Sequence, residues 1–255
     1  MLSVIVPTYN EAGALPLLIR RLSAALEGAQ IPYEIVVVDD SSPDGTGELA
    51  ERLAASYPIR VLRRPAKAGL ASAVLDGIRI ASGDLIGVMD ADLSHPPEVI
   101  PTMVRAIEQT PGVDLAVGSR YVRGGRIEDW PLRRTIVSAV ANLLTRWLTP
   151  VKDATSGFFV IRRAALEGVS LNPIGFKIGL EVIARARYRG YVEVPYVFTD
   201  RKQGMSKFGP AEVWSFLKQL AILYRSCSAR RRPNSLPALA PASARPEEAP
   251  AHSRP

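Results

Sequence analysis

Residues 34–46 read Glu-Ile-Val-Val-Val-Asp-Asp-Ser-Ser-Pro-Asp-Gly-Thr. The apolar part, from Ile35 to Val38, is continuous rather than alternating, which is typical of a strand buried on both faces of a parallel sheet. Two carboxylates, Asp39 and Asp40, follow it directly and lead into a segment of turn-forming residues. The stretch therefore predicts a central strand whose carboxyl end opens onto a polar loop, where open α/β sheets bind ligands.

The same pattern recurs along the first half of the chain. Predicted strands and helices alternate over residues 2–7, 15–26, 34–39, 46–56, 59–62, 70–81, 85–89, 97–108 and 115–118. Strands that alternate with helices indicate βαβ units. We therefore predict an α/β fold with a mainly parallel central sheet flanked by helices.

The second half of the chain is less regular. Its predicted elements are helices at 135–148, 180–189 and 213–224 and strands at 158–161 and 191–196. From Arg230 onward the chain is rich in Pro, Ala, Ser and Arg and has little apolar bulk, which is typical of disorder. We therefore predict one domain over residues 1–229, including C-terminal amphipathic helices, and a disordered tail over residues 230–255.

The net charge of +7 is unevenly distributed. Residues 1–119 carry 9 Lys and Arg against 15 Asp and Glu, whereas residues 120–152 carry 7 against 2 and residues 200–232 carry 8 against 2. Basic segments of this kind suit anionic partners such as phosphates, nucleic acid or an acidic lipid surface. Solvated side chains on helix faces are the alternative interpretation for some of these residues.

Several classes of protein are disfavoured by what the sequence lacks. No apolar run approaches the ~18–20 residues that a membrane-spanning helix needs, and the first residues resemble a strand rather than a secretion signal. The single cysteine, Cys227, excludes an intrachain disulfide and fits a reducing compartment. The sequence contains neither Gly-x-Gly-x-x-Gly nor Gly-x-x-x-x-Gly-Lys-Ser/Thr, the two glycine-rich patterns that bind phosphates. Their absence disfavours a dinucleotide-binding dehydrogenase and a P-loop phosphotransferase.

An acidic pair follows another predicted strand. Residues 88–97 read Val-Met-Asp-Ala-Asp-Leu-Ser-His-Pro-Pro, which places Asp90 and Asp92 at a strand end. Burying this pair without compensation would cost several kcal/mol, so we expect a cation there. Mg²⁺ typically takes one or two carboxylates together with substrate phosphates. A metal-bridged diphosphate is our hypothesis, and two solvated turn aspartates are the alternative.

Polar residues at the other strand ends are expected at the same edge of the sheet. Acidic groups there can accept hydrogen bonds from a nucleotide base and its ribose, and we favour this role for Glu11 and Asp40. Asp44, Gly45 and Thr46 are ordinary turn and helix-cap residues, so we favour a structural role for them.

Seven motifs in a fixed order resemble the inverting glycosyltransferases of family 2, which have the GT-A fold, and among these the dolichol-phosphate (polyprenol-phosphate) mannose synthase family. The motifs are Pro7–Glu11, Val38–Thr46, Asp90–Pro97, Gly118–Tyr121, Trp130–Arg134, Asp153–Phe158 and Arg201–Lys207. The resemblance covers roughly residues 2–225. Each motif alone is weak to moderate evidence for this family, but the seven motifs in this order are very specific for it.

The resemblance implies GDP-mannose as the sugar donor. The residues that would hold its guanosine part are Pro7, Tyr9, Glu11, Val38 and Asp40. The residues that would line its diphosphate are Asp90, Ala91 and Asp92, with Mg²⁺ or Mn²⁺ as the cofactor on Asp90 and Asp92. Some relatives have Gln where this chain has Ser94, so the third metal ligand is Ser94 or a water.

The resemblance also implies a polyprenyl (dolichyl) monophosphate as the acceptor. Arg120, Arg201 and Lys207 would contact phosphates, while Arg134 and Ser138 would form the site for the acceptor phosphate. The implied catalytic residues are Asp92, Arg120 and Arg134. Because a phosphate monoester is already an anionic nucleophile, positioning matters more than deprotonation and no dedicated general base is required. Attack on the face opposite GDP would give the β-linked product.

A lipid acceptor would also explain the basic second half. Arginines surround the apolar helix predicted at 135–148, and such a helix can lie in a membrane interface or pack on the core. We expect the protein at the cytoplasmic face of a membrane, bound peripherally or through a separate membrane-spanning partner.

Two alternatives are retained. The same fold could transfer another sugar, for example glucose from UDP-glucose, to a polyprenyl phosphate. A non-catalytic protein that binds a membrane surface or nucleic acid is the second alternative. We expect no nucleic-acid partner, because the aligned carboxylates would repel phosphates without a metal.

Overall fold

The computed structural model describes residues 1–128, 130–172, 177–199, 210–227 and 234–235. The strands are β1 (Leu2–Thr8), β2 (Tyr33–Asp39), β3 (Ile59–Arg63), β4 (Leu85–Val88), β5 (Leu115–Ser119), β6 (Arg126–Glu128), β7 (Phe159–Arg162), β8 (Gly190–Pro195), β9 (Val197–Thr199) and β10 (Asn234–Ser235). The helices are α1 (Leu15–Gly28), α2 (Thr46–Leu53), α3 (Leu70–Ile80), α4 (Ile100–Gln109), α5 (Leu132–Thr145), α6 (Ile178–Arg185) and α7 (Pro210–Cys227), with short 3₁₀ turns η1 (Pro97–Val99) and η2 (Arg163–Leu166).

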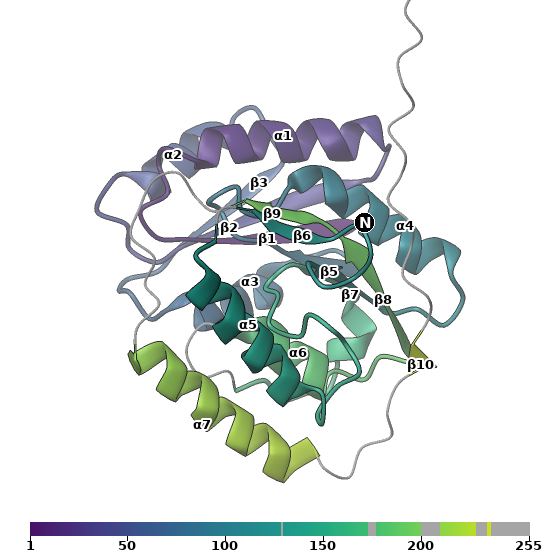
Figure 1. Ribbon diagram of the computed structural model, residues 1–255. Helices are drawn as coiled ribbons and strands as arrows, with labels where there is room; N and C mark the ends of the chain where they lie inside the picture. The colour runs from purple at the N-terminus through teal and green to yellow at the C-terminus, as the bar shows by residue number, and fades with distance from the viewer. Residues whose placement is uncertain (129, 173–176, 200–209, 228–233, 236–255) are drawn as a thin grey trace, which may run out of the picture.

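The main sheet has the strand order β10-β8-β5-β7-β4-β1-β2-β3. Only β7 runs antiparallel to its neighbours β4 and β5, and the other neighbouring pairs of this sheet are parallel. The predicted mainly parallel α/β sheet is therefore confirmed. Helices cover both of its faces, with α1, α2 and α4 on one and α3 and α6 on the other (Figure 1).

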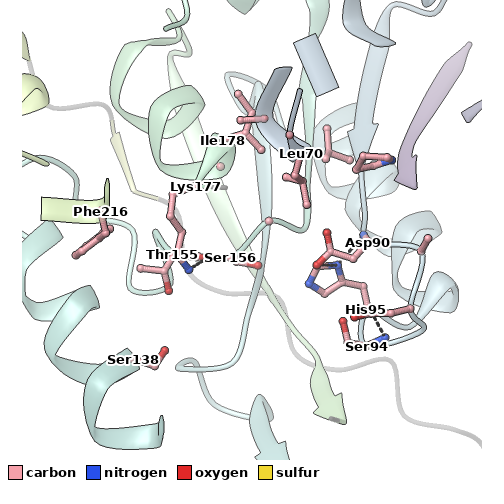
Figure 2. A pocket seen from close by; sticks show the side chains of 18 of the residues that line it. Leu70, Asp90, Ser94, His95, Ser138, Thr155, Ser156, Lys177, Ile178 and Phe216 are labelled. Atoms are coloured by element: carbon pink, nitrogen blue, oxygen red, sulfur yellow. Dashed lines mark hydrogen bonds and ion pairs between the residues drawn. The ribbon is translucent and has the colours of Figure 1, made fainter. Parts of the chain in front are cut away.

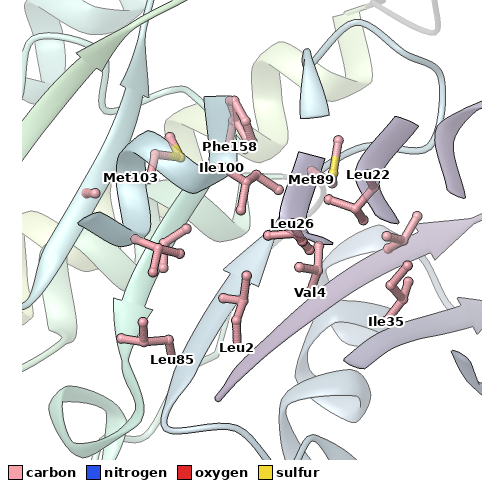
Figure 3. Close-up of a cluster of buried hydrophobic side chains, with 14 of the residues drawn as sticks. Leu2, Val4, Leu22, Leu26, Ile35, Leu85, Met89, Ile100, Met103 and Phe158 are labelled. Atoms are coloured by element: carbon pink, nitrogen blue, oxygen red, sulfur yellow. The ribbon is translucent and has the colours of Figure 1, made fainter. Parts of the chain in front are cut away.

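Two hydrophobic clusters hold these layers together. One lies between the sheet and α1 and α4, and it includes Leu22 and Leu26 of α1 and Met103 of α4 (Figure 3). The other lies between the sheet and helices α3, α6 and α7. Because the central strands contact both clusters, their runs are apolar without alternation, as a strand covered on both faces requires.

The strand register brings the acid-bearing turns to one edge of the sheet. β1 pairs in parallel with β2, placing Thr8 beside Asp39, and also with β4, placing Ile5 beside Val88. The chain therefore leaves all three strands at the same edge, as predicted from the sequence. This edge positions the candidate site.

The structure differs from the sequence-based expectations in several elements. Helix α6 ends at Arg185 rather than at 189, because Ala186 is extended and the Tyr188 ring turns back into the core. The short parallel pair β6–β9 was not predicted. Asn234 and Ser235, in the part predicted to be a disordered tail, pair with β8, since an edge strand bonds through its backbone whatever its side chains are. Residues 236–255 lie outside the described residues.

Candidate functional site

A cavity of about 880 Å³ opens at this edge of the sheet. Of the predicted site residues, those that line it are Pro7, Tyr9, Glu11, Asp40, Asp90, Ala91, Asp92, Ser94, Arg120, Arg134 and Ser138. The side chain of Val38 is instead fully buried in the core. Arg201 and Lys207 lie outside the described residues. The structure thus brings eleven residues from both halves of the chain to a single cavity.

The turns that follow β1, β2 and β4 are conformationally special. Each contains a residue other than glycine in the left-handed region: Asn10 (φ 62°), Ser41 (φ 61°) and Leu93 (φ 64°). Such conformations cost on the order of 1–3 kcal/mol each and persist only where the surroundings impose them. The three turns are therefore held in place by the rest of the structure, as is common at binding sites.

Hydrogen bonds between the first two turns supply part of this restraint. The Thr46 hydroxyl accepts from the backbone N–H of Glu11 (3.0 Å), and the Asp44 carboxylate accepts from that of Ala12 (3.1 Å). Burial alone would raise the pKa of Asp44, but hydrogen bonds from Thr46 and Ala12 outweigh it and lower the pKa. Asp44 and Thr46 thus act as structural residues, as the sequence indicated.

Asp40 reaches the cavity but also organises its wall. Its carboxylate accepts hydrogen bonds from the Arg64 guanidinium (2.9 Å) and from the backbone N–H groups of Ala68 (2.9 Å) and Gly69 (2.8 Å). A carboxylate has about four acceptor positions. Within the described part of the chain, three are used to fix the segment before α3, which leaves about one for a ligand.

The acidic pair after β4 is anchored by buried neighbours. The backbone N–H of Ser94 donates to Asp92 (3.1 Å), and that of Asp90 donates to Nδ1 of His95 (3.1 Å). His95 is buried and stacked on Phe158 at 4.9 Å between ring centroids. Burial lowers the pKa of His95, against the opposing charges of Asp90 and Asp92, so the ring is neutral and Nδ1 is an acceptor. Figure 2 shows His95 directly beside Asp90.

This arrangement fits a hard divalent cation. Asp90 and Asp92 both line the cavity and offer carboxylate oxygens, the ligands that Mg²⁺ and Mn²⁺ favour. Within the described ranges, no group of three or more Asp, Glu, His or Cys side chains could hold a metal without further ligands. Substrate phosphate oxygens, water or the buried Ser94 would have to complete the coordination.

Arg120 is held by a buried ion pair. Its Nε and Nη2 donate to the two carboxylate oxygens of Asp153 at 2.8 and 2.7 Å, and the Asp153 side chain is fully buried. Burial would lower the pKa of Arg120, but Asp153 raises it well above its usual value. Arg120 therefore lines the cavity as a fixed guanidinium whose charge is largely offset.

Arg134 and Ser138 lie four residues apart on α5 and so share one helix face. The Arg134 guanidinium carbon lies 4.1 Å from the centroid of the Trp130 ring. The Ser138 hydroxyl accepts a hydrogen bond from the Tyr121 hydroxyl (2.9 Å). Both side chains line the cavity, as an acceptor-phosphate site would require.

Helices α5 and α7 expose apolar surface next to the cavity. The exposed apolar residues of these helices and of the turn after α5, here called the apolar surface, are Ile136, Val140, Leu143, Leu144, Trp147, Val213, Trp214, Leu217 and Ile222. Trp147 is 79% exposed and Trp214 is 72% exposed. The helix predicted at 135–148 spans Leu132–Thr145 in the structure; Ala141 in the helix and Leu148 just after it pack on the core, and the other face is left uncovered. Across the described residues, we find no helix both long and apolar enough to span a bilayer.

Sequence reasoning missed several polar residues of the cavity wall, among them two lysines and a histidine. The Lys67 ammonium lies 3.6 Å from the centroid of the Tyr9 ring, and His95 and Lys177 lie deeper in the site. Lys67 and Lys177 carry no periodic or charge-cluster signal. The sequence shows that His95 follows Asp90 by five residues, but it does not reveal that His95 accepts a hydrogen bond from the Asp90 backbone.

A family model described as glycosyl transferase family 2 matches residues 3–169. The dolichol-phosphate mannosyltransferase of Pyrococcus furiosus is 48% identical over 222 residues, which are 86% of this chain and 62% of that protein. The chain thus spans less than two thirds of that relative. The polyprenol monophosphomannose synthase of Mycolicibacterium smegmatis is 41% identical over 223 residues, covering 82% of each chain.

Solved structures support the fold. Glucosyl-3-phosphoglycerate synthase from Mycobacterium tuberculosis, in complex with Mn²⁺, uridine diphosphate and glucosyl-3-phosphoglycerate, matches with a TM-score of 0.64 at 19% identity over 91% of this chain and 81% of that one. A mannosyltransferase from Pyrobaculum calidifontis in complex with GDP-Man and Mn²⁺ matches with a TM-score of 0.56 at 20% identity over 91% of this chain and 65% of that one.

Proposed function

The chain belongs to glycosyl transferase family 2, and from this membership we propose that it is a metal-dependent inverting mannosyltransferase. It transfers mannose from GDP-mannose to a polyprenyl (dolichyl) monophosphate and forms polyprenyl-phosphate β-mannose. The observation that carries the proposal is a single cavity with the pair Asp90 and Asp92 in one part of its wall and Arg134 and Ser138 in another. The names of both curated relatives support mannose transfer to a polyprenyl phosphate.

The donor is proposed to lie over the turns after β1, β2 and β4. Guanosine would contact Pro7, Tyr9, Glu11 and Asp40. The remaining acceptor position of the Asp40 carboxylate suits a hydrogen-bond donor of the base or the ribose. Asp90 and Asp92 would hold Mg²⁺ or Mn²⁺, which would offset the charge that develops on the leaving diphosphate. The Mn²⁺ and GDP-Man bound to the Pyrobaculum structure support this choice of ligands.

The acceptor phosphate is proposed to lie against Arg134 and Ser138. A guanidinium can hold two phosphate oxygens at once, so Arg134 would fix the orientation of the nucleophile. Arg120, held rigidly by Asp153, would present a positioned guanidinium where the two substrates meet. Because the phosphate is already ionised at neutral pH, these residues position it and exclude water without removing a proton.

The apolar surface is proposed to contact a membrane. Val140 and Leu144 of α5 and Leu217 of α7 are exposed and also line the cavity, so the surface is continuous with the acceptor side. A polyprenyl chain could then stay in lipid while its phosphate enters the cavity. We place the protein at the cytoplasmic face, bound peripherally or with a separate membrane-spanning partner.

A radiolabelled-sugar assay tests the proposed function. Wild-type protein is incubated with Mn²⁺, a polyprenyl phosphate and either GDP-[¹⁴C]mannose or UDP-[¹⁴C]glucose, and label in the organic phase is counted. We expect lipid-linked label from GDP-mannose and a β-linked product by NMR. Transfer from UDP-glucose alone would replace the donor, and transfer from neither would refute the proposed reaction.

A further inference from the structure

Lys177 is held at the start of α6 by contacts on several sides. Its ammonium donates to the backbone carbonyl of Thr155 (3.3 Å), and its own carbonyl accepts from Gln219 of α7 (3.4 Å). Its side chain lines the cavity. Figure 2 shows it extending toward Thr155 and Ser156, in the region between Phe216 and Asp90. The side chain is thus fixed between the helical part of the wall and the acidic pair.

Several charges lie close to this ammonium. The pKa of Lys177 is lowered to about 8, chiefly by burial; the positive charges of Arg120 and Arg134 contribute, while Asp153 and Asp90 oppose the shift. Arg120, Arg134 and Lys177 all line the same cavity. Concentrating positive charge where water is scarce is costly unless an anion occupies the site.

The charge of the acceptor matches this cluster. A phosphate monoester carries about −1.5 to −2 at pH 7. The charge of Arg120 is largely offset by Asp153, with both guanidinium contacts at 2.8 Å or less. Arg134 and Lys177 are two further cations in the wall of the same cavity, and contacts with both would match the charge of a dianion.

We propose that Lys177 binds the phosphate of the polyprenyl phosphate acceptor together with Arg134, and so helps to hold the nucleophile against the sugar. This inference rests on the proposed function. The donor diphosphate is a less suitable ligand, because the metal at Asp90 and Asp92 would already offset its charge. Lys67, the cation over Tyr9, lies instead beside the predicted guanosine site.

Three variants test this role. Lys177→Met removes the charge at similar length, Lys177→Arg retains it, and Lys152→Met is the control because Lys152 is exposed and outside the cavity. The dissociation constant of GDP-mannose with Mn²⁺ is measured by calorimetry, and kcat and KM for a short-chain polyprenyl phosphate by radiolabel transfer.

We expect Lys177→Met to raise the acceptor KM by about 10- to 100-fold, the range for losing a hydrogen bond to a charged group. The GDP-mannose dissociation constant should stay unchanged, and Lys177→Arg should recover part of the acceptor affinity. A merely structural lysine would not produce this split. An unchanged acceptor KM, or a GDP-mannose affinity that falls as much as acceptor affinity, would overturn the proposal.

A measurement on the wild-type protein covers the case in which Lys177→Met does not fold. Lysines are acetylated with a limiting reagent, and modification is quantified by mass spectrometry with citronellyl phosphate, citronellol, or GDP-mannose and Mn²⁺ present. We expect only citronellyl phosphate to protect Lys177, with Lys152 unaffected. Absence of this protection contradicts the role of Lys177, whereas failed sugar transfer with protection intact contradicts the proposed reaction alone.

Discussion

The turns after β1, β2 and β4 and the helices α5 and α7 line the same cavity but are built differently. The turns come from the acidic first half and are fixed by short polar contacts, such as those of Asp40 with the segment before α3. The helices come from the second half, where Trp147, just after α5, and Trp214 of α7 are exposed to solvent. The difference indicates a division of labour, with a rigid polar wall for a nucleotide sugar and an apolar wall for a lipid.

The largest expected effect is on the polar wall. Asp92→Ala should lower kcat/KM by about a thousandfold or more, ~4 kcal/mol, because the metal that stabilises the leaving diphosphate loses a carboxylate. Calorimetry should also show weaker metal-dependent binding of GDP-mannose. Asp84→Ala is the matched control, since Asp84 is 87% exposed. Wild-type transfer by Asp92→Ala would remove Asp92 from the site.

Substitution of Asp153, a buried carboxylate in the second half of the chain, should affect the stability of the protein rather than metal binding. Asp153→Ala leaves the Arg120 guanidinium buried without its counter-ion and should lower the free energy of unfolding by about 3 kcal/mol. Glu128→Ala breaks the exposed pair with Arg126 (2.8 Å) and should change it little. Urea unfolding of both variants measures the difference. Equal, small losses would show that the Arg120–Asp153 pair contributes no more than a surface pair.

Arg134 tests whether the two walls bind different substrates. Arg134→Ala should raise the acceptor KM by roughly 10- to 100-fold, as expected when a charged hydrogen bond is lost. Its affinity for GDP-mannose should be retained. Arg146→Ala, an exposed arginine just beyond α5, is the control, and both are assayed with a short, soluble polyprenyl phosphate. Loss of donor binding in Arg134→Ala would place this residue in the donor site.

The smallest expected effect concerns the apolar surface. Trp147→Glu should weaken sedimentation with phosphatidylglycerol-containing vesicles by about tenfold, because part of the ~1.5–3 kcal/mol from burying a large apolar side chain is lost. Transfer to a soluble acceptor should be unchanged. Leu17→Glu changes an exposed apolar residue on α1 and should leave vesicle binding intact. Equal losses in both variants would contradict a specific membrane surface.

The regular part of the fold could be predicted because its signal is local. Continuous apolar runs such as Ile35–Val38 marked the buried strands, and the acids that follow them were expected at one edge because parallel strands share it. The same logic placed Glu11, Asp40 and Asp90 together, and all three line the cavity.

The rest depends on contacts between distant residues. Asp153 pairs with Arg120 across 33 positions, and Lys177 reaches Thr155 across 22, with no periodicity to reveal either contact. The short pair β6–β9 and the early end of α6 are set by tertiary packing. Val38 illustrates a different difficulty. The family resemblance implied that it contacts the donor, but its side chain lies in the hydrophobic core.

The most direct test of the division between the walls is a crystal structure with GDP-mannose, Mn²⁺ and a short polyprenyl phosphate. The account predicts Mn²⁺ on Asp90 and Asp92, guanosine over the turns after β1 and β2, and the acceptor phosphate at Arg134. A structure with the metal away from the acidic pair, or with the nucleotide against α5 and α7, would contradict it.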